Sequence, residues 1–220
     1  MGQVSGRGCV RPRGSRERPR YESRIACNYW LGSDPREAIW ACVRVVPTAV
    51  SVSTDMAVAF YPGSFDPFHL GHLDIAEQAV ALFGDLVIGV MHNPDKPSGM
   101  FSPAERADLV RQSVAHLGKK VCVETYGGLT VEAASKIEAS FIIKSARTGG
   151  DFEVEQQMAQ TNQGASGIET ILLFSRPEHS FISSRYIRQF VGFSGTNATP
   201  MVSTPVLKAL IAKQTPGAKK

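Results

Sequence analysis

Short apolar runs alternate with segments of helical periodicity from residue 56 onward. The first run, 56–61, has the β-branched and aromatic character of a buried strand. After it, apolar residues recur at helical spacing and a glycine suited to end a helix follows, at Ile75, Ala76, Ala79, Val80, Phe83 and Gly84. Alternation of this kind predicts a parallel sheet whose two faces are covered by helices.

The same alternation continues to residue 212. We expect further strands at 86–91, 121–124, 141–143 and 170–174. We expect helices at 103–117, 130–139, 152–161, 184–191 and 204–212. The run Ser102-Pro103-Ala104-Glu105 reads as a capping box with proline at the first helical position. The predicted fold class is α/β, a Rossmann-like doubly wound parallel sheet that forms one domain over 56–220.

The segment 1–55 differs from the rest in composition. It holds nine arginines, no lysine and five acidic residues, whereas 56–220 hold fifteen basic and fifteen acidic residues, so the net charge of +4 belongs to the first segment. A basic nucleic-acid arm or an organellar transit peptide would explain the arginines. We favour a disordered or untranslated extension with Met56 as the real start, because the first core strand follows Met56 directly and no sustained periodicity precedes it.

Composition also bounds localisation and partners. No apolar stretch reaches membrane-spanning length, and the balanced charge of 56–220 argues against a nucleic-acid partner. Cys9, Cys27 and Cys42 precede residue 56, which leaves Cys122 as the single cysteine of the main domain. A single thiol cannot form a disulfide within that domain, which is typical of a reducing cytosol. We therefore expect a cytoplasmic protein with neither a membrane nor a nucleic acid as partner.

The stretch YPGSFDPFHLGH, residues 61–72, joins the first strand to the first helix and carries His69 and His72 one helical turn apart. Unpaired N–H groups and the positive end of the helix dipole favour an anion there, and imidazole donors add contacts. Gly63 and Gly71 allow a close approach of the backbone, and Ser64 offers a hydroxyl. The pattern predicts a phosphate-binding site; the alternative is a tight turn with surface histidines.

Three more polar clusters follow predicted strands. They are Lys96 in a proline-rich loop, Lys144 and Arg147 before the acidic start of a helix, and the run Ser180–Arg185. Each has a plainer explanation: a solvated lysine, acids matched to a helix dipole, or serines that cap a helix. Because ligands bind beyond the carboxyl ends of parallel strands, we expect the four clusters to meet at one edge of the sheet.

Three motifs together resemble the nucleotidyltransferases of the HxGH class, and most closely the phosphopantetheine adenylyltransferase family. They are GSFDPFHLGH, IIKSARTGGDFEVEQQMAQTN and HSFISSRYIR, and the resemblance covers essentially all of 56–220. Nicotinate and nicotinamide mononucleotide adenylyltransferases share the first and last motifs, but the DFEVE segment separates them from this sequence. Class I aminoacyl-tRNA synthetases share the histidine motif, yet they are far larger and need a lysine-containing signature that is absent from this sequence.

The resemblance implies a reaction of ATP with 4′-phosphopantetheine that gives dephospho-coenzyme A and pyrophosphate, with Mg²⁺. It also implies a homohexamer and coenzyme A as a feedback ligand. The acceptor phosphate attacks the α-phosphorus of ATP in line, so catalysis consists of placement and charge stabilisation. Two alternatives stay open: an adenylyltransferase for nicotinate or nicotinamide mononucleotide, and a non-catalytic nucleotide- or nucleic-acid-binding regulator whose arginine-rich segment is the functional part.

The resemblance assigns roles to residues by position. Catalysis falls to His72, Lys96 and Lys144, with no protein ligand to a metal. The acceptor substrate is bound by Ser64, Lys96, Leu129, Thr130, Lys144 and Asn162. ATP is bound by Ser64, Phe65, His72, Ser145, Ala146, Arg147, Glu155, His179, Ser180, Phe181, Ile182, Ser183, Ser184 and Arg185.

Four positions depart from the family pattern. Ser64 stands where threonine is common, which keeps the hydroxyl. Lys144 stands where many members carry arginine, which keeps the charge and loses the bidentate fork. Ser145 replaces a glycine, and Arg185 replaces a small hydroxyl residue.

Overall fold

A computed structural model describes residues 57–93, 99–193 and 195–214, apart from the side chains of 192–197. The contacts divide the chain into two units, Met1–Thr54 and Asp55–Lys220. The expectations for 1–55, for Met56 and for Lys96 fall outside the described residues and stay predictions.

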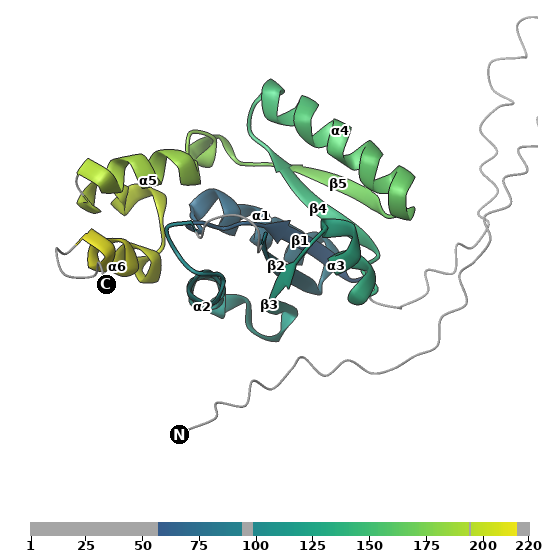
Figure 1. The fold of residues 1–220 in the computed structure, drawn as a ribbon, viewed down its shortest axis with the longest axis horizontal. Coiled ribbons are helices and arrows are strands. Elements are labelled where there is room, and N and C mark those ends of the chain that lie inside the picture. Colours follow the sequence, from purple (N-terminus) through teal and green to yellow (C-terminus); the bar gives the residue numbers. More distant parts are fainter. Residues whose placement is uncertain (1–56, 94–98, 194, 215–220) are drawn as a thin grey trace, which may run out of the picture. The chain divides into compact units, whose positions relative to one another are not determined.

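A parallel sheet of five strands forms the centre of the second unit (Figure 1). The strands are β1 (Ala59–Gly63), β2 (Leu86–His92), β3 (Val121–Gly127), β4 (Phe141–Ala146) and β5 (Glu169–Phe174), in the order β3-β2-β1-β4-β5. The chain moves outward from β1 to β3, then crosses back and continues beside β1 with β4. The sheet confirms the predicted α/β fold and puts the change of direction between β1 and β4.

The helices are α1 (Leu70–Phe83), α2 (Pro103–Ser113), α3 (Thr130–Lys136), α4 (Gly149–Ser166), α5 (Ser184–Phe193) and α6 (Thr204–Gln214), with 3₁₀ turns at Ala115–Lys120, Pro177–His179 and Gly195–Met201. Neighbouring residues of β1 belong to different cores: Ala59 and Tyr61 pack with α1, α2, α5 and α6, whereas Phe60 packs with α3. This follows from the alternation of side chains along a strand, and it confirms a sheet buried on both faces.

Capping residues set the helix ends where the sequence predicts them. Ser102 accepts from the backbone N–H of Glu105 at 3.3 Å, and the Glu105 carboxylate accepts from the backbone N–H of Ser102 at 2.7 Å. Gly84 ends α1 with a φ of 82°, a value that residues other than glycine rarely adopt. The predicted capping box at 102–105 is therefore confirmed.

Several predicted boundaries are wrong, and local geometry explains the differences. The strand predicted at 56–61 runs from Ala59 to Gly63, and the helix predicted to 117 ends at Ser113, before a 3₁₀ turn in which Gly118 has a φ of 63°. The helix predicted to 139 ends at Lys136, because Glu138 adopts a φ of 52°. Boundaries of this kind depend on single left-handed residues, which periodicity does not reveal.

Two differences affect the site. The strand predicted at 141–143 continues to Ala146, so Lys144 and Ser145 lie within β4 rather than after it. The helix predicted at 152–161 spans Gly149–Ser166, because the Thr148 hydroxyl caps it by accepting from the backbone N–H of Asp151 at 3.2 Å. The cap offsets the low helix propensity of the two glycines that follow.

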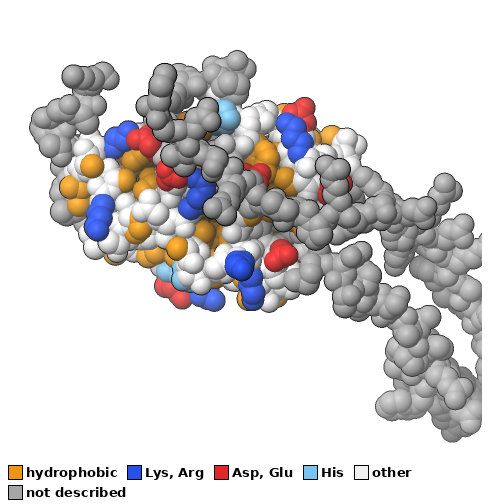
Figure 2. All heavy atoms as spheres, turned by 90° about the horizontal axis from the view of Figure 1, so that it is seen from below, with side chains coloured by type: hydrophobic (Ala, Val, Ile, Leu, Met, Phe, Trp, Pro, Cys, Tyr) orange, Lys and Arg blue, Asp and Glu red, His pale blue; other side chains and the backbone are white. Residues whose placement is uncertain are grey.

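Charges are interspersed on the face drawn in Figure 2, where acidic and basic side chains of the described residues lie close to one another. Exposed ion pairs such as Arg111–Asp108 at 2.7 Å have this character. None of the described helices combines the length and the hydropathy needed to cross a membrane. The cytoplasmic localisation stays a prediction.

Candidate active site

A cavity of about 420 Å³ opens at the carboxyl ends of β1 and β4. Three of the four predicted clusters meet in it: the loop after β1, the end of β4 with the start of α4, and the loop before α5. Ten of the predicted site residues line it, namely Ser64, Phe65, His72, Lys144, Ser145, Arg147, Glu155, Ser183, Ser184 and Arg185. The expected meeting of the clusters at one edge of the sheet is thus confirmed for these three.

Buried polar groups hold the loop after β1 from the α2 side. Asp66 accepts from the backbone N–H groups of Met100 at 2.8 Å and Phe101 at 3.0 Å. Arg106, which is 6% exposed, donates to the carbonyl of Ser64 at 2.6 Å. Phe65 adopts a φ of 48° in this loop, a strained value for a large side chain. The bonds from Asp66 and Arg106 oppose relaxation of that strain, so the Ser64 hydroxyl has a fixed place.

Helix α5 holds the same loop from the other side. Ser184 donates to the carbonyl of Pro67 at 2.9 Å, and Arg188 donates to the carbonyl of Asp66. Ser184 was predicted to contact the nucleotide, yet in this structure its hydroxyl is committed to the loop. The first and last motifs are therefore joined by direct hydrogen bonds.

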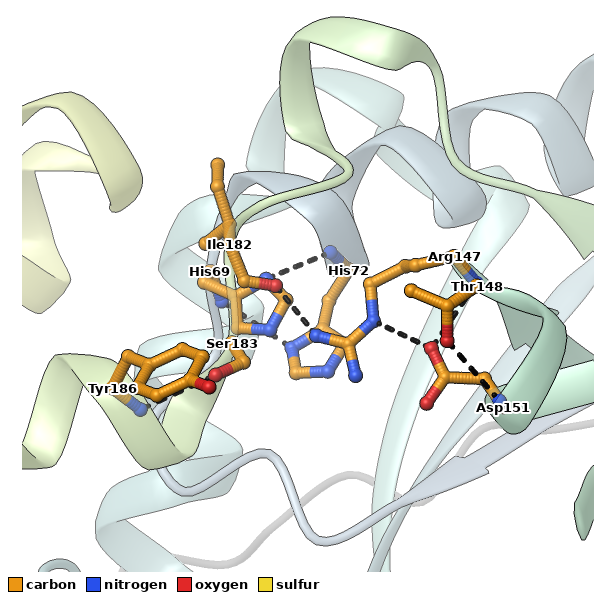
Figure 3. Close-up of polar contacts among 8 residues, drawn as sticks. All are labelled: His69, His72, Arg147, Thr148, Asp151, Ile182, Ser183 and Tyr186. Atoms are coloured by element: carbon orange, nitrogen blue, oxygen red, sulfur yellow. Dashed lines mark hydrogen bonds and ion pairs between the residues drawn. The ribbon is translucent and has the colours of Figure 1, made fainter.

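His69 and His72 form a stacked pair at the start of α1 (Figure 3). Their ring centroids lie 3.6 Å apart with an angle of 16° between the planes. Each Nδ1 accepts from the backbone N–H of the other residue, at 3.4 Å for His72 and 3.3 Å for His69. A neutral imidazole whose Nδ1 accepts carries its proton on Nε2. The cap therefore fixes both tautomers and leaves the Nε2–H of His72, which lines the cavity, as a donor.

Burial keeps both rings neutral. It lowers the pKa of His72 from its ordinary value of 6.5 to about 3, with a further contribution from the positive charge of Arg147. Burial also lowers the pKa of His69 well below 6.5, and electrostatic interactions with His72, Arg147 and His179 lower it further by smaller amounts. Phe65 and Phe68 pack against the His72 ring, at centroid distances of 5.1 Å and 5.5 Å. At neutral pH His72 is thus a neutral hydrogen-bond donor and carries no positive charge.

This lowered pKa predicts a pH dependence of stability. Between about pH 3 and 6.5 the unfolded chain binds protons on His72 that the folded chain does not bind. The free energy of unfolding should therefore decrease as the pH falls below 6.5. Urea unfolding at pH 7.5 and pH 5.0 measures this, and His72→Gln should make the decrease smaller. An equal decrease in the variant would contradict the assignment to His72.

Two cations enter the cavity from β4 and its end. Arg147 pairs with Asp151, with Nε 3.2 Å from the carboxylate, and its Nη1 donates to the carbonyl of Ile182 at 2.7 Å (Figure 3). Lys144 pairs with Glu155 at 3.3 Å. Both carboxylates come from α4, so the unit formed by β4, α4 and the turn between them supplies the cations and their partners together.

The loop after β5 is anchored by Asp74 of α1, whose side chain is 1% exposed. Its carboxylate accepts from the backbone N–H of Arg176 at 2.9 Å and pairs with the Arg176 guanidinium at 3.2 Å. A buried carboxylate with such partners fixes the start of the loop. The segment that carries Ser183 and Arg185 to the cavity thereby begins from a set position.

Some predicted site residues do not line the cavity. Leu129 lies at the start of α3 and is largely exposed, Thr130 begins that helix, and Asn162 is buried in α4. Ala146 is buried, and Ile182 takes part through its carbonyl alone. His179, Ser180 and Phe181 lie in the loop before α5; the Ser180 hydroxyl donates to the carbonyl of Pro177 at 2.8 Å. Roles for these residues stay predictions.

Sequence reasoning missed the groups that hold the loops. Asp66, Asp74 and Arg106 were given no role in the site, and Asp151 was noted only as part of the acidic start of a helix. Spacing offers a signal for Asp151 alone, because it lies only four residues after Arg147 along the chain. The bonds of Asp66 and Asp74 reach 34 and 102 residues along the chain.

The described residues contain no group of three or more His, Cys, Asp or Glu side chains placed to hold a metal ion. The two carboxylates beside the cavity, Asp151 and Glu155, are each paired with a cation. Mg²⁺ is commonly bound largely by substrate phosphates and water. The donor set therefore suits a metal that arrives with a nucleotide.

Comparisons with known proteins agree with this geometry. Residues 60–190 match the family described as Cytidylyltransferase-like. The phosphopantetheine adenylyltransferase of Synechococcus sp. (strain JA-2-3B'a(2-13)) is 42% identical over 154 residues, which cover 70% of this chain and 95% of the relative. The phosphopantetheine adenylyltransferase of Thermosynechococcus vestitus is 41% identical over 162 residues, which cover 72% and 95%.

A solved structure shares the fold. The bifunctional NMN adenylyltransferase/ADP ribose pyrophosphatase from Francisella tularensis aligns with a TM-score of 0.52 at 14% identity, over 71% of this chain and 49% of that protein. The chain thus spans about half the length of that protein, and the likeness is one of fold alone. Taken with the identities above, the match over most of the domain shows that the chain belongs to the cytidylyltransferase-like family and, within it, to the phosphopantetheine adenylyltransferases.

Proposed function

We propose that the protein transfers the adenylyl group of ATP to 4′-phosphopantetheine, releasing pyrophosphate and forming dephospho-coenzyme A. The observation that carries the proposal is the convergence of His72, Lys144 and Arg147 in one cavity at the carboxyl ends of β1 and β4. Two phosphorylated substrates repel each other, and at about 4 Å two unit charges interact by about 4 kcal/mol at an effective dielectric constant of 20. The cations offset that repulsion before the reaction.

The reaction needs no covalent enzyme intermediate. A phosphate oxygen of 4′-phosphopantetheine attacks the α-phosphorus of ATP, and the bond to the bridging oxygen of pyrophosphate breaks. Negative charge on the non-bridging oxygens is stabilised by donors that are already in place. The neutral His72, with its proton on Nε2, is such a donor, and it takes no proton from the acceptor.

The other residues place the two substrates. Lys144 and the Ser64 hydroxyl hold the acceptor phosphate, with Lys96 assigned the same role from the sequence. Arg147, Ser183 and Arg185 contact the ATP phosphates, whereas the Ser184 hydroxyl holds the loop after β1. Glu155, which pairs with Lys144 at 3.3 Å, is assigned a contact to the nucleotide from the sequence. Mg²⁺ enters as part of the MgATP substrate.

A pyrophosphate-release assay tests the proposal. Purified protein with MgATP and 4′-phosphopantetheine should release pyrophosphate, and nicotinate or nicotinamide mononucleotide as acceptor should release far less. The product should be dephospho-coenzyme A by mass spectrometry. Faster release with a mononucleotide acceptor would overturn the proposed substrate.

A homo-oligomer, as the family implies, is supported by exposed apolar side chains on α4 and β5. Val154 and Phe174 are 62% and 63% exposed, and Met158 is 48% exposed. Exposed apolar groups close together on a surface are typical of interfaces. Sedimentation tests whether the protein is a hexamer, and Val154→Asp should dissociate the proposed oligomer. Coenzyme A as a competing ligand and the cytoplasmic localisation belong to the same proposal.

A further inference from the structure

The guanidinium of Arg147 is held at two of its three nitrogens. Its Nε lies 3.2 Å from Oδ2 of Asp151, and its Nη1 donates to the carbonyl of Ile182 at 2.7 Å. The same Oδ2 accepts from the backbone N–H of Arg147 at 3.2 Å. One carboxylate oxygen therefore fixes both the main chain and the side chain of this residue.

Asp151 is fixed in turn by its own helix. Its backbone N–H donates to the Thr148 hydroxyl at 3.2 Å, and it lies in the first turn of α4, where the helix dipole favours a negative charge. If the Asp151 carboxylate faced solvent, its only role would be to stabilise the helix dipole. It faces Arg147 instead, as Figure 3 shows.

The third nitrogen of the guanidinium, Nη2, has no hydrogen-bond partner among residues 57–93, 99–193 and 195–214, and Arg147 lines the cavity. An arginine has many rotamers, and ordering it at the moment of binding costs free energy. An arginine that is already ordered avoids that cost.

From this geometry we infer that Asp151 is a positioning residue for the reaction: it holds Arg147 in the orientation that receives the phosphates of the nucleotide. Arg147 then joins two separate segments, the β4–α4 turn through Asp151 and the loop before α5 through Ile182. The inference rests on the proposed function in that the cavity binds ATP, and it does not depend on the identity of the acceptor.

Calorimetric titration with MgATP tests the inference without any acceptor. Asp151→Ala should weaken ATP binding about tenfold, because the ordering of Arg147 is lost. Asp151→Asn, which keeps an acceptor oxygen and loses the charge, should fall between the wild type and Asp151→Ala. Arg147→Ala should weaken binding more than either change at Asp151.

The double variant Asp151→Ala/Arg147→Ala decides between positioning and a general structural role. If Asp151 acts through Arg147, the double variant should bind ATP as Arg147→Ala does, because nothing remains to be positioned. Multiplied effects of the two changes would overturn the inference. Asp108→Ala is the matched control: it removes an arginine–aspartate pair on α2, whose partners are exposed and outside the cavity. Its ATP affinity should equal that of the wild type.

Two further readouts separate other outcomes. Thermal unfolding should show each variant folded at the temperature of titration; ATP affinity that recovers at lower temperature would mean that Asp151 serves stability alone, against the inference. A shift in the Mg²⁺ concentration for half-maximal binding, with unchanged affinity at saturating Mg²⁺, would make Asp151 a metal ligand and would also overturn it. If ATP affinity depends on Asp151 and Arg147 as expected, yet the wild type does not adenylylate 4′-phosphopantetheine, the proposed function fails and the positioning role stands.

Discussion

Replacing His72 by alanine should reduce turnover by about 10²-fold or more while ATP affinity changes little. The side chain is neutral and its proton lies on Nε2, because Nδ1 accepts from the backbone N–H of His69. A neutral donor gains most when negative charge grows on the phosphoryl oxygens, so its loss is felt in the transition state. Single-turnover kinetics and ATP titration measure the two quantities separately.

His72 also caps α1, so a control must separate the cap from the donor. Removal of such a cap costs about 1 kcal/mol of stability. His72→Gln provides the control, because glutamine at this third helical position can restore the bond to the backbone N–H of residue 69. The glutamine variant should recover stability without recovering turnover. Recovery of both would show that the cap, and not the donor, matters for catalysis.

The pH dependence of turnover also tests the role of His72 as a neutral donor. Since the pKa of His72 lies at about 3, its proton-binding state does not change between pH 5 and 8. Titration of His72 therefore should not contribute an inflection near pH 6.5 to the pH–rate profile. Any inflection there in the wild type should also be present in His72→Ala. An inflection that is lost in His72→Ala would mean that His72 titrates in the working range.

The sequence predicts this site as far as its parts follow from local patterns. Strand-to-helix junctions are readable from periodicity, and in a parallel sheet their loops must gather at one edge. The placing of Ser64, His72 and Arg147 in one cavity follows from that rule. The pairing of Lys144 with Glu155 could also be predicted from the sequence, because both residues belong to one strand–turn–helix unit.

What holds the site in place could not be predicted in the same way. Arg106 reaches the Ser64 carbonyl across 42 residues, and Arg147 reaches the Ile182 carbonyl across 35. Bonds of this kind depend on how two loops pack, and neither partner has a pattern in its own segment. The tautomer of His72 likewise depends on the reciprocal cap with His69, whereas the sequence shows only the spacing of the two rings.

Replacing Lys144 by alanine should raise the KM for 4′-phosphopantetheine by about 10- to 100-fold, with a much smaller change in the KM for ATP. The Lys144 side chain is 21% exposed and lines the cavity, so its charge acts through a medium that screens less than bulk water. The acceptor phosphate would lose that cation while keeping the Ser64 hydroxyl. Initial rates with each substrate varied in turn give both constants.

Two variants make the Lys144 result specific. Lys144→Ala leaves Glu155 without its partner at 3.3 Å, and an unpaired carboxylate beside the cavity would itself repel the acceptor. The double variant Lys144→Ala/Glu155→Gln removes that repulsion, so the part of the increase in KM that remains belongs to the lost cation. Lys144→Arg restores the charge with a guanidinium fork and should keep the KM for 4′-phosphopantetheine near that of the wild type. An unchanged KM in Lys144→Ala, or an increase confined to ATP, would place the acceptor phosphate elsewhere in the cavity.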